Sequence, residues 1–183
     1  MTGLDGSAPF DLAVVGGGPG GLATVLAAEA QRPEWRIAWW RGATPGFLPA
    51  YGGNHPVHRL NVPVERMGLD AEAPVDFLDW LRAAHPSRAV RPGDFVPRAW
   101  FGEYLAHRAA RVRATAVDAD VVDLRRTDAG WALEGAGGRA ATSRRVVLAV
   151  GLPAPLPMPG APPHWVGDPW AWWRRHAEGP LPR

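Results

Sequence analysis

The sequence contains no cysteine among its 183 residues. This absence excludes disulfide bonds, thiolate metal sites and redox-active dithiols, and it agrees with a cytoplasmic protein. The chain also lacks lysine, so it has no phosphate-binding loop of the G-x-x-x-x-G-K-[ST] type. The serines are Ser7, Ser87 and Ser143, and none stands in a G-x-S-x-G motif that would mark a nucleophilic serine.

Long apolar runs and concentrated charge are missing as well. No run is long enough to span a bilayer, and the segment Met1–Phe10 carries no basic residue that would begin a secretory signal. The basic residues, all of them arginine, are scattered along the chain, and the net charge is only +2. We therefore expect neither a membrane nor a nucleic acid as partner.

The most informative stretch runs from Asp11 to Ala30, DLAVVGGGPGGLATVLAAEA. Residues 12–15 predict a short buried strand, and residues 22–30, which are rich in Ala and Leu, predict a helix. Between them lies the run GGGPGG at positions 16–21. A G-x-G-x-x-G motif that joins a strand to a helix is typical of dinucleotide-binding folds.

The residues of this turn have separate physical roles. Gly16 permits the tight turn, Gly18 lets the backbone approach a pyrophosphate, and Gly21 allows the helix to pack closely on the strand. Pro19 and Gly20 complete the turn, and free N–H groups at the start of the helix would face the phosphates. A glycine-rich turn that binds nothing is the alternative, but the flanking strand and helix favour nucleotide binding.

A second strand is predicted over Trp35–Trp40, WRIAWW, and Arg41 follows it. At this position dinucleotide-binding folds carry an acidic residue that accepts hydrogen bonds from ribose hydroxyls. An arginine side chain accepts no hydrogen bond. Two interpretations stay open. Arg41 pairs with a 2′-phosphate, which favours NADP as the ligand, or the ribose contact is lost and nucleotide affinity is weaker.

The middle of the chain is predicted to combine a long loop with two helices. The loop Gly42–Pro63 is rich in glycine and proline, and we expect it to cover a cofactor. Its His55 and His58 have no acidic partner close by, so we predict no metal site. Helices are predicted over Pro74–His85 and Pro97–Val112 from the helical spacing of their apolar residues.

From Thr115 onward the apolar pattern changes to a period of two. Strands are predicted over Thr115–Leu124, Gly130–Glu134 and Arg139–Thr142, and they would form an antiparallel meander. The run Arg145–Val150, RVVLAV, predicts a second buried strand. Beyond it the chain is rich in proline and tryptophan, and this apolar surface predicts a packing partner.

Several segments, in this order, resemble a group of bacterial flavoproteins akin to FAD-dependent urate hydroxylases and aspartate N-monooxygenases. They are GGGPGG (16–21), AY (50–51), HRLNVPVERM (58–67), DFLDWL (76–81), PRAWFGEYL (97–105), VVDLRRTDAGW (121–131) and VVLAVG (146–151). The similarity extends from Asp11 to Trp170. It implies an α/β fold, a Rossmann-like FAD/NAD(P)-binding domain in which a parallel sheet with helices carries an inserted antiparallel β-meander.

The resemblance also implies cofactors. Members of this group bind FAD and use NAD(P)H to reduce it before oxygen is transferred to a substrate. By their place in the motif, Gly16, Gly18 and Gly21 would hold the FAD pyrophosphate. NADP remains an alternative ligand because of Arg41. The substrate is an unknown small molecule, and the sequence identifies no catalytic residue.

Two further groups of residues acquire roles through the resemblance alone. Val121 or Val122 would offer its backbone to the adenine, and Gly151 would close the turn near the cofactor. The loop around Asn61 and Val62 would lie over the flavin region.

The expected organisation has three parts, a flexible N-terminus over 1–10, an FAD/NAD(P)-binding domain over 11–152 and a Pro/Trp-rich tail over 153–183. Flavoproteins of this group usually continue much further, so we expect a truncated chain whose tail packs on a second domain or chain. The leading hypothesis is the FAD-binding part of a flavin-dependent, NAD(P)H-using monooxygenase-like oxidoreductase. A non-catalytic or degenerate dinucleotide-binding module is the alternative.

Overall fold

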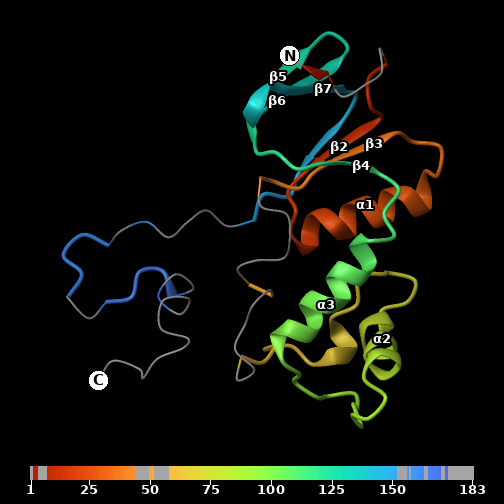
Figure 1. Cartoon of the computed structure of the whole chain (residues 1–183), viewed down its shortest axis with the longest axis vertical. Coiled ribbons are helices and arrows are strands. Elements are labelled where there is room, and N and C mark those ends of the chain that lie inside the picture. The colour runs from red at the N-terminus through yellow and green to blue at the C-terminus, as the bar shows by residue number, and fades with distance from the viewer. Residues whose placement is uncertain are drawn as a thin grey trace.

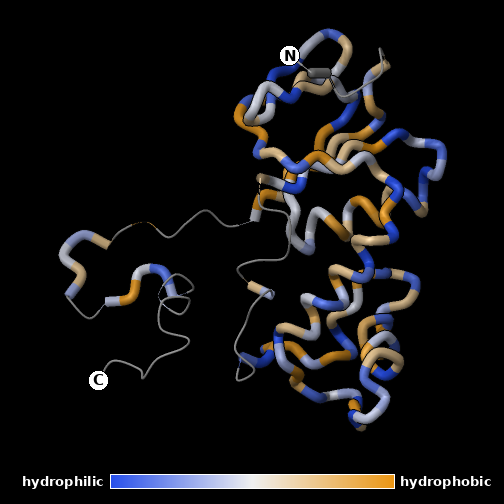
Figure 2. Tube along the Cα trace, viewed as in Figure 1, coloured by the Kyte–Doolittle hydropathy of each residue, from blue (hydrophilic) through white to orange (hydrophobic). Residues whose placement is uncertain are grey.

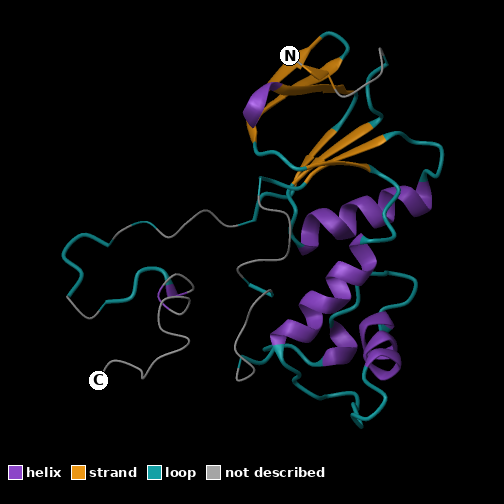
Figure 3. Ribbon diagram, in the orientation of Figure 1, coloured by secondary structure: helices purple, strands orange, loops and turns teal. Residues whose placement is uncertain are grey.

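The computed structural model describes residues 2–3, 8–43, 50–51, 58–151, 156, 158–162, 165–169 and 172. Within these residues the chain forms two sheets, three α-helices and two short 3-10 helices (Figures 1 and 3). The elements are β1 (Thr2–Gly3), β2 (Leu12–Val15), α1 (Pro19–Gln31), β3 (Ile37–Trp40), η1 (Val64–Arg66), α2 (Asp76–Ala84), α3 (Arg98–Ala109), β4 (Thr115–Val117), β5 (Val121–Thr127), β6 (Gly130–Gly135), η2 (Ala136–Gly138), β7 (Arg139–Ser143) and β8 (Val146–Leu148).

Four strands form a parallel sheet in the order β4-β3-β2-β8. The chain leaves β2, passes through α1 and returns as β3, which is the strand–helix–strand unit that the sequence predicts. Because β2 lies between β3 and β8, the order of the sheet reverses at β2. Open α/β sheets bind ligands outside the carboxyl ends of their strands at such a point.

Alternate residues of β2 and β3 belong to two separate cores, as the two-residue period of a strand requires. The core beside the helices contains Leu12, Val14, Ile37 and Trp39. The core beside the other sheet contains Ala13, Val15, Ala38 and Trp40. Both faces are therefore buried, which explains the uninterrupted apolar runs LAVV and IAWW. In Figure 2 the apolar colouring appears on the central strands and also along the helices.

The second sheet contains the predicted antiparallel meander, formed by β5, β6 and β7, with β1 paired in parallel to β7. The prediction of one strand over Thr115–Leu124 is wrong. Its first part is β4, which extends the parallel sheet beside β3, whereas β5 begins at Val121 and pairs with β6. The short connection Asp118–Asp120 therefore carries the chain from one sheet to the other.

The helices differ from the predictions only at their ends. The helix α1 begins at Pro19, before the predicted start at Leu22, because proline suits the first turn of a helix. Both α2 and α3 lie inside their predicted ranges and pack on one another. The expected face of α2 is buried through Phe77, Leu78 and Leu81. Among the described residues, no helix has both the length and the apolar character that crossing a bilayer requires.

The strand β8 corresponds to the one predicted over Arg145–Val150, but the prediction that it is buried is wrong. Within the described part of the chain β8 is an edge of the parallel sheet, and Leu148 is 60% exposed. Residues 44–49 and 52–57, with His55 among them, lie outside the described residues, and so does most of the stretch after 151. The covering loop, the absence of a metal site there and the packing partner of the tail stay predictions.

Candidate functional site

The chain after β2 turns through Gly16–Gly21 at the carboxyl edge of the parallel sheet. Gly16 has a φ of 132°, in the region that favours glycine. A Cβ atom on Gly16 would lie closer than 3.0 Å to the carbonyl oxygen of Ala149, which follows β8. One on Gly21 would lie equally close to the carbonyl oxygen of Gly16. These two positions therefore require glycine, because any side chain would push the backbone of the turn apart.

Gly18 and Gly20 face a different environment, since a Cβ atom on either would meet nothing within 4 Å. Gly18 is the N-cap of α1, Pro19 is its first residue, and no acidic residue occupies the first turn. The first amides of a helix lack acceptors within the helix and carry the positive end of its dipole. The open side of the turn thus combines close access to the backbone with the positive potential that a pyrophosphate requires.

The strand β3 brings Trp39 and Arg41 to the same edge. The indole Nε1 of Trp39 donates a hydrogen bond to the carbonyl oxygen of Gly16 at 2.9 Å. A Cβ atom on Gly17 would lie closer than 3.0 Å to the carbonyl oxygen of Arg41, so the backbone of Arg41 packs against the glycine turn. The guanidinium of Arg41 lies over the Trp39 ring, 5.6 Å from its centroid.

The side chain of Arg41 has a partner that the sequence analysis missed, Asp118 in the connection after β4. Nε of Arg41 donates to Oδ1 of Asp118 at 2.8 Å, and Nη2 donates to Oδ2 at 2.9 Å. The two side chains are 28% and 46% exposed. Two residues further on, Asp120 accepts a hydrogen bond from the amide of Ala43 at 3.1 Å. The two carboxylates together fix the segment that follows β3.

A signal for Asp118 is present in the sequence. Aspartate is depleted in strands, so the run D-A-D at 118–120 marks an interruption in the strand predicted there. The alternation of Val117, Ala119 and Val121 hides this interruption, because these residues pack on one apolar core although the pairing partner changes.

Two other predicted site residues follow β8 and begin β5. Gly151 has a φ of 72° and comes two residues after Ala149, which packs on Gly16. Val122 is 67% exposed and lies at an irregularity in the pairing of β5 with β6. Its neighbour Val121 is opposite Gly135. Their contacts with a cofactor stay predictions.

Asn61 and Val62 precede η1, and the neighbouring backbone joins them to the part of the chain between α2 and α3. The amide of Leu60 donates to the carbonyl oxygen of Val96 at 2.9 Å. The amide of Val64 donates to the carbonyl oxygen of Asp94 at 3.1 Å. The structure thus shows what holds this segment, and its predicted place over a flavin stays a prediction.

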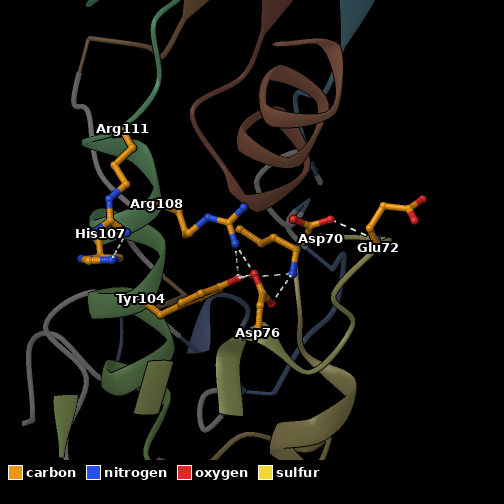
Figure 4. Close-up of polar contacts among 8 residues, drawn as sticks. Asp70, Glu72, Asp76, Tyr104, His107, Arg108 and Arg111 are labelled. Carbon is orange, nitrogen blue, oxygen red and sulfur yellow. Dashed lines mark hydrogen bonds and ion pairs between the residues drawn. The ribbon is translucent and has the colours of Figure 1, made fainter. Parts of the chain in front are cut away.

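A second polar cluster lies between α2 and α3 (Figure 4). The carboxylate of Asp76 accepts hydrogen bonds from the hydroxyl of Tyr104, the guanidinium of Arg108 and the amide of Leu69. The side chains of Arg108 and Asp76 are 20% and 14% exposed. Burial, followed by the hydrogen bond to Asp76, raises the pKa of the Tyr104 hydroxyl. These groups satisfy one another, so the cluster fastens the segment before α2 to α3.

Comparison with known families shows what the chain is similar to. The model of a family described as FAD-NAD(P)-binding matches residues 13–153. This range holds the glycine turn, Arg41, Asp118 and every element from α1 to β8. No curated protein sequence matches the chain.

Solved structures of a hydroxylase and of monooxygenases share the fold. The ornithine N-hydroxylase of Kutzneria sp. 744 aligns over 81% of this chain with a TM-score of 0.64 and 18% identity. A steroid monooxygenase bound to NADP aligns over 83% with a TM-score of 0.63 and 20% identity. Cyclohexanone monooxygenase aligns over 86% with a TM-score of 0.62 and 18% identity. The chain spans 39%, 28% and 28% of the lengths of these proteins.

Proposed function

The chain belongs to the FAD/NAD(P)-binding family, and from this premise we propose that its glycine turn holds the pyrophosphate of FAD. The observation that carries the proposal is the division of the turn into two sides. Gly16 and Gly21 leave no room for a Cβ atom, whereas Gly18 and Gly20 face open space at the start of α1. An anion on the open side would meet the first amides of α1.

The residues at this edge would share the work of binding. The backbone at Gly18 and Gly20 would approach the phosphates, and Pro19 between them would hold the turn without adding a donor. Trp39 supports the turn through its hydrogen bond to Gly16. The proposal also includes the expected contacts of Val122 and Gly151 near the adenine and the turn, and those of Asn61 and Val62 near the flavin.

We infer further that this domain is the FAD-binding part of a flavin-dependent, monooxygenase-like oxidoreductase that uses NAD(P)H as reductant. Bound FAD would supply hydride and electron transfer, while the protein supplies binding and orientation. The support is the family match and the fold shared with larger hydroxylases and monooxygenases. A small-molecule substrate, a second domain or chain to complete its site, and a cytoplasmic location are part of this proposal.

Substitution of Gly18 by alanine tests the binding site. The change adds one methyl group where the free protein has room, so the fold should persist while the approach of a pyrophosphate is blocked. We expect isothermal titration calorimetry to show roughly tenfold weaker FAD binding, with an unchanged unfolding midpoint. Gly167→Ala, which adds a methyl group to an exposed glycine outside the turn, is the matched control. Equal FAD affinity in the wild type and Gly18→Ala would contradict the proposal.

The FAD-loaded protein separates the oxidoreductase from a binding module. NADH or NADPH is added under nitrogen while the visible absorption of oxidised flavin is followed. A loss of that absorption would show that the bound FAD is reduced, which would support an oxidoreductase. The nucleotide that reduces FAD faster would be the preferred reductant. Tight FAD binding without bleaching by either nucleotide would show that this chain by itself is a dinucleotide-binding module without turnover.

A further inference from the structure

The carboxyl ends of β3 and β4 bring together two charged residues that are 77 positions apart in the sequence. The amide of Arg41 donates to the carbonyl oxygen of Val117 at 2.9 Å, which continues the β3–β4 pairing to the end of both strands. The next residue after Val117 is Asp118, so its carboxylate stands beside the Arg41 side chain. The backbone of Arg41 in turn packs on Gly17. The Arg41–Asp118 pair therefore lies next to the glycine turn.

A ribose at this edge needs an acceptor that position 41 does not provide. In dinucleotide-binding folds the residue at the end of the second strand accepts hydrogen bonds from ribose hydroxyls, and arginine has only donors. Asp118 supplies the missing chemistry, because its two oxygens offer about four acceptor positions. Arg41 uses one position on each oxygen. With 46% of its side chain exposed, Asp118 retains acceptor capacity toward solvent.

We propose that Asp118 is the ribose acceptor of the dinucleotide site, that Arg41 is its positioning residue, and that the pair selects a free 2′-hydroxyl over a 2′-phosphate. This inference rests on the proposed function and names the residue that discriminates between ligands. A 2′-phosphate would meet the negative charge of Asp118, while the charge of Arg41 is already paired. The site therefore suits FAD or NAD better than NADP.

The surroundings of the pair explain how Asp118 can act as the acceptor although Arg41 occupies the usual position of the acidic residue. The bidentate pair fixes the orientation of the carboxylate, which an exposed aspartate alone would not keep. The Trp39 ring lies beneath the guanidinium, and Asp120 holds the amide of Ala43. These contacts limit the freedom of both side chains, so a ribose would find the acceptor already oriented.

The test compares nucleotides that differ only at the 2′ position. Wild type and Asp118→Ala are first titrated with FAD by calorimetry, and then with ADP, 2′-deoxy-ADP and adenosine 2′-phosphate 5′-diphosphate. We expect the wild type to bind ADP roughly tenfold more tightly than 2′-deoxy-ADP, and Asp118→Ala to bind the two about equally. Asp118→Ala should also gain affinity for the 2′-phosphorylated ADP relative to ADP, because Arg41 is released to pair with the 2′-phosphate.

The matched control is Asp123→Ala, which removes a carboxylate that is 44% exposed and pairs with Arg125 in the other sheet. It should keep the wild-type preference for ADP. If Asp118→Ala weakens ADP and 2′-deoxy-ADP binding equally, or changes neither, Asp118 is not the ribose acceptor although FAD binding stands. If the wild type binds neither FAD nor ADP, the proposed function fails and this inference with it.

Discussion

Two arginine–aspartate pairs in this protein have the same chemistry and opposite surroundings. In the pair between α2 and α3, Asp76 is 14% exposed and accepts from Arg108, Tyr104 and the amide of Leu69. In the pair at the sheet edge, Asp118 is 46% exposed and accepts only from Arg41 among the hydrogen bonds found in the described residues.

The difference shows what burial does to a charged pair. A buried carboxylate must have its acceptor positions filled by the protein, and removal of one partner leaves an uncompensated charge. An exposed carboxylate keeps water on its remaining positions, and a ligand hydroxyl can replace that water. We therefore expect the Asp76 pair to hold the fold and the Asp118 pair to serve a ligand.

The largest expected effect is that of Asp76→Ala. The substitution leaves the guanidinium of Arg108 and the hydroxyl of Tyr104 without their acceptor, so we expect a loss of about 3 kcal/mol in the free energy of unfolding. Urea denaturation followed by circular dichroism measures it. The control is Asp79→Ala on the same helix, where an exposed carboxylate lies 3.6 Å from Arg82. Its effect should stay within about 0.5 kcal/mol. Similar losses in the two variants would show that the buried Asp76–Arg108 pair contributes no more to the free energy of unfolding than the exposed Asp79–Arg82 pair.

Tyr104→Phe should have an intermediate effect, a loss of about 1.5 kcal/mol near neutral pH, because one donor to Asp76 disappears. The effect should depend on pH. Burial, with the hydrogen bond to Asp76, raises the pKa of Tyr104 in the folded state. A raised pKa gives stability that is complete below the unfolded value of about 10 and falls as the pH rises above it.

Denaturation of both proteins from about pH 8 to about pH 11 measures this dependence. The wild type should lose stability above about pH 10 more steeply than Tyr104→Phe, so the difference between them should narrow. Tyr51 and the arginines are common to both proteins and cancel in the comparison. A difference that stays constant over this range would mean that Tyr104 ionises equally in the folded and unfolded chains.

The sequence predicted the two central strands of the parallel sheet, β2 and β3, because a strand buried on both faces is apolar at every position. The runs LAVV and IAWW are apolar at every position, and the structure gives each face of both strands its own core. The helix α1 was predicted from its Ala and Leu content, and α2 and α3 from their apolar spacing, with errors only at the ends. The glycine turn was recognised because strand, turn and helix follow one another locally, so no distant contact had to be known.

The errors arose because an apolar pattern indicates which residues are buried, but it does not indicate which strand or side chain they pair with. The alternation of apolar residues over Thr115–Leu124 continues through Asp118 without a break. The strand that pairs with this segment nevertheless changes from β3 to β6. The run RVVLAV gave the right strand, but apolar residues do not say which neighbour covers them. Arg41 was identified as unusual, and its partner could not be predicted because only the fold brings residues 77 positions apart together.

The smallest expected effect is that of Asp118→Ala on the protein without nucleotide. The pair with Arg41 is exposed, so we expect a change in the free energy of unfolding below about 1 kcal/mol. Arg41→Met, which keeps an apolar stem over the Trp39 ring, should change it as little. Urea denaturation measures these changes. The comparison of Asp118→Ala with Asp76→Ala applies the same substitution to the exposed pair and to the buried pair. A loss at Asp118 as large as at Asp76 would make the edge pair a structural element, since the two carboxylates would then contribute equally despite their different exposure. A small loss, together with altered nucleotide preference, would show that the same two side chains hold the fold when buried and discriminate between ligands when exposed.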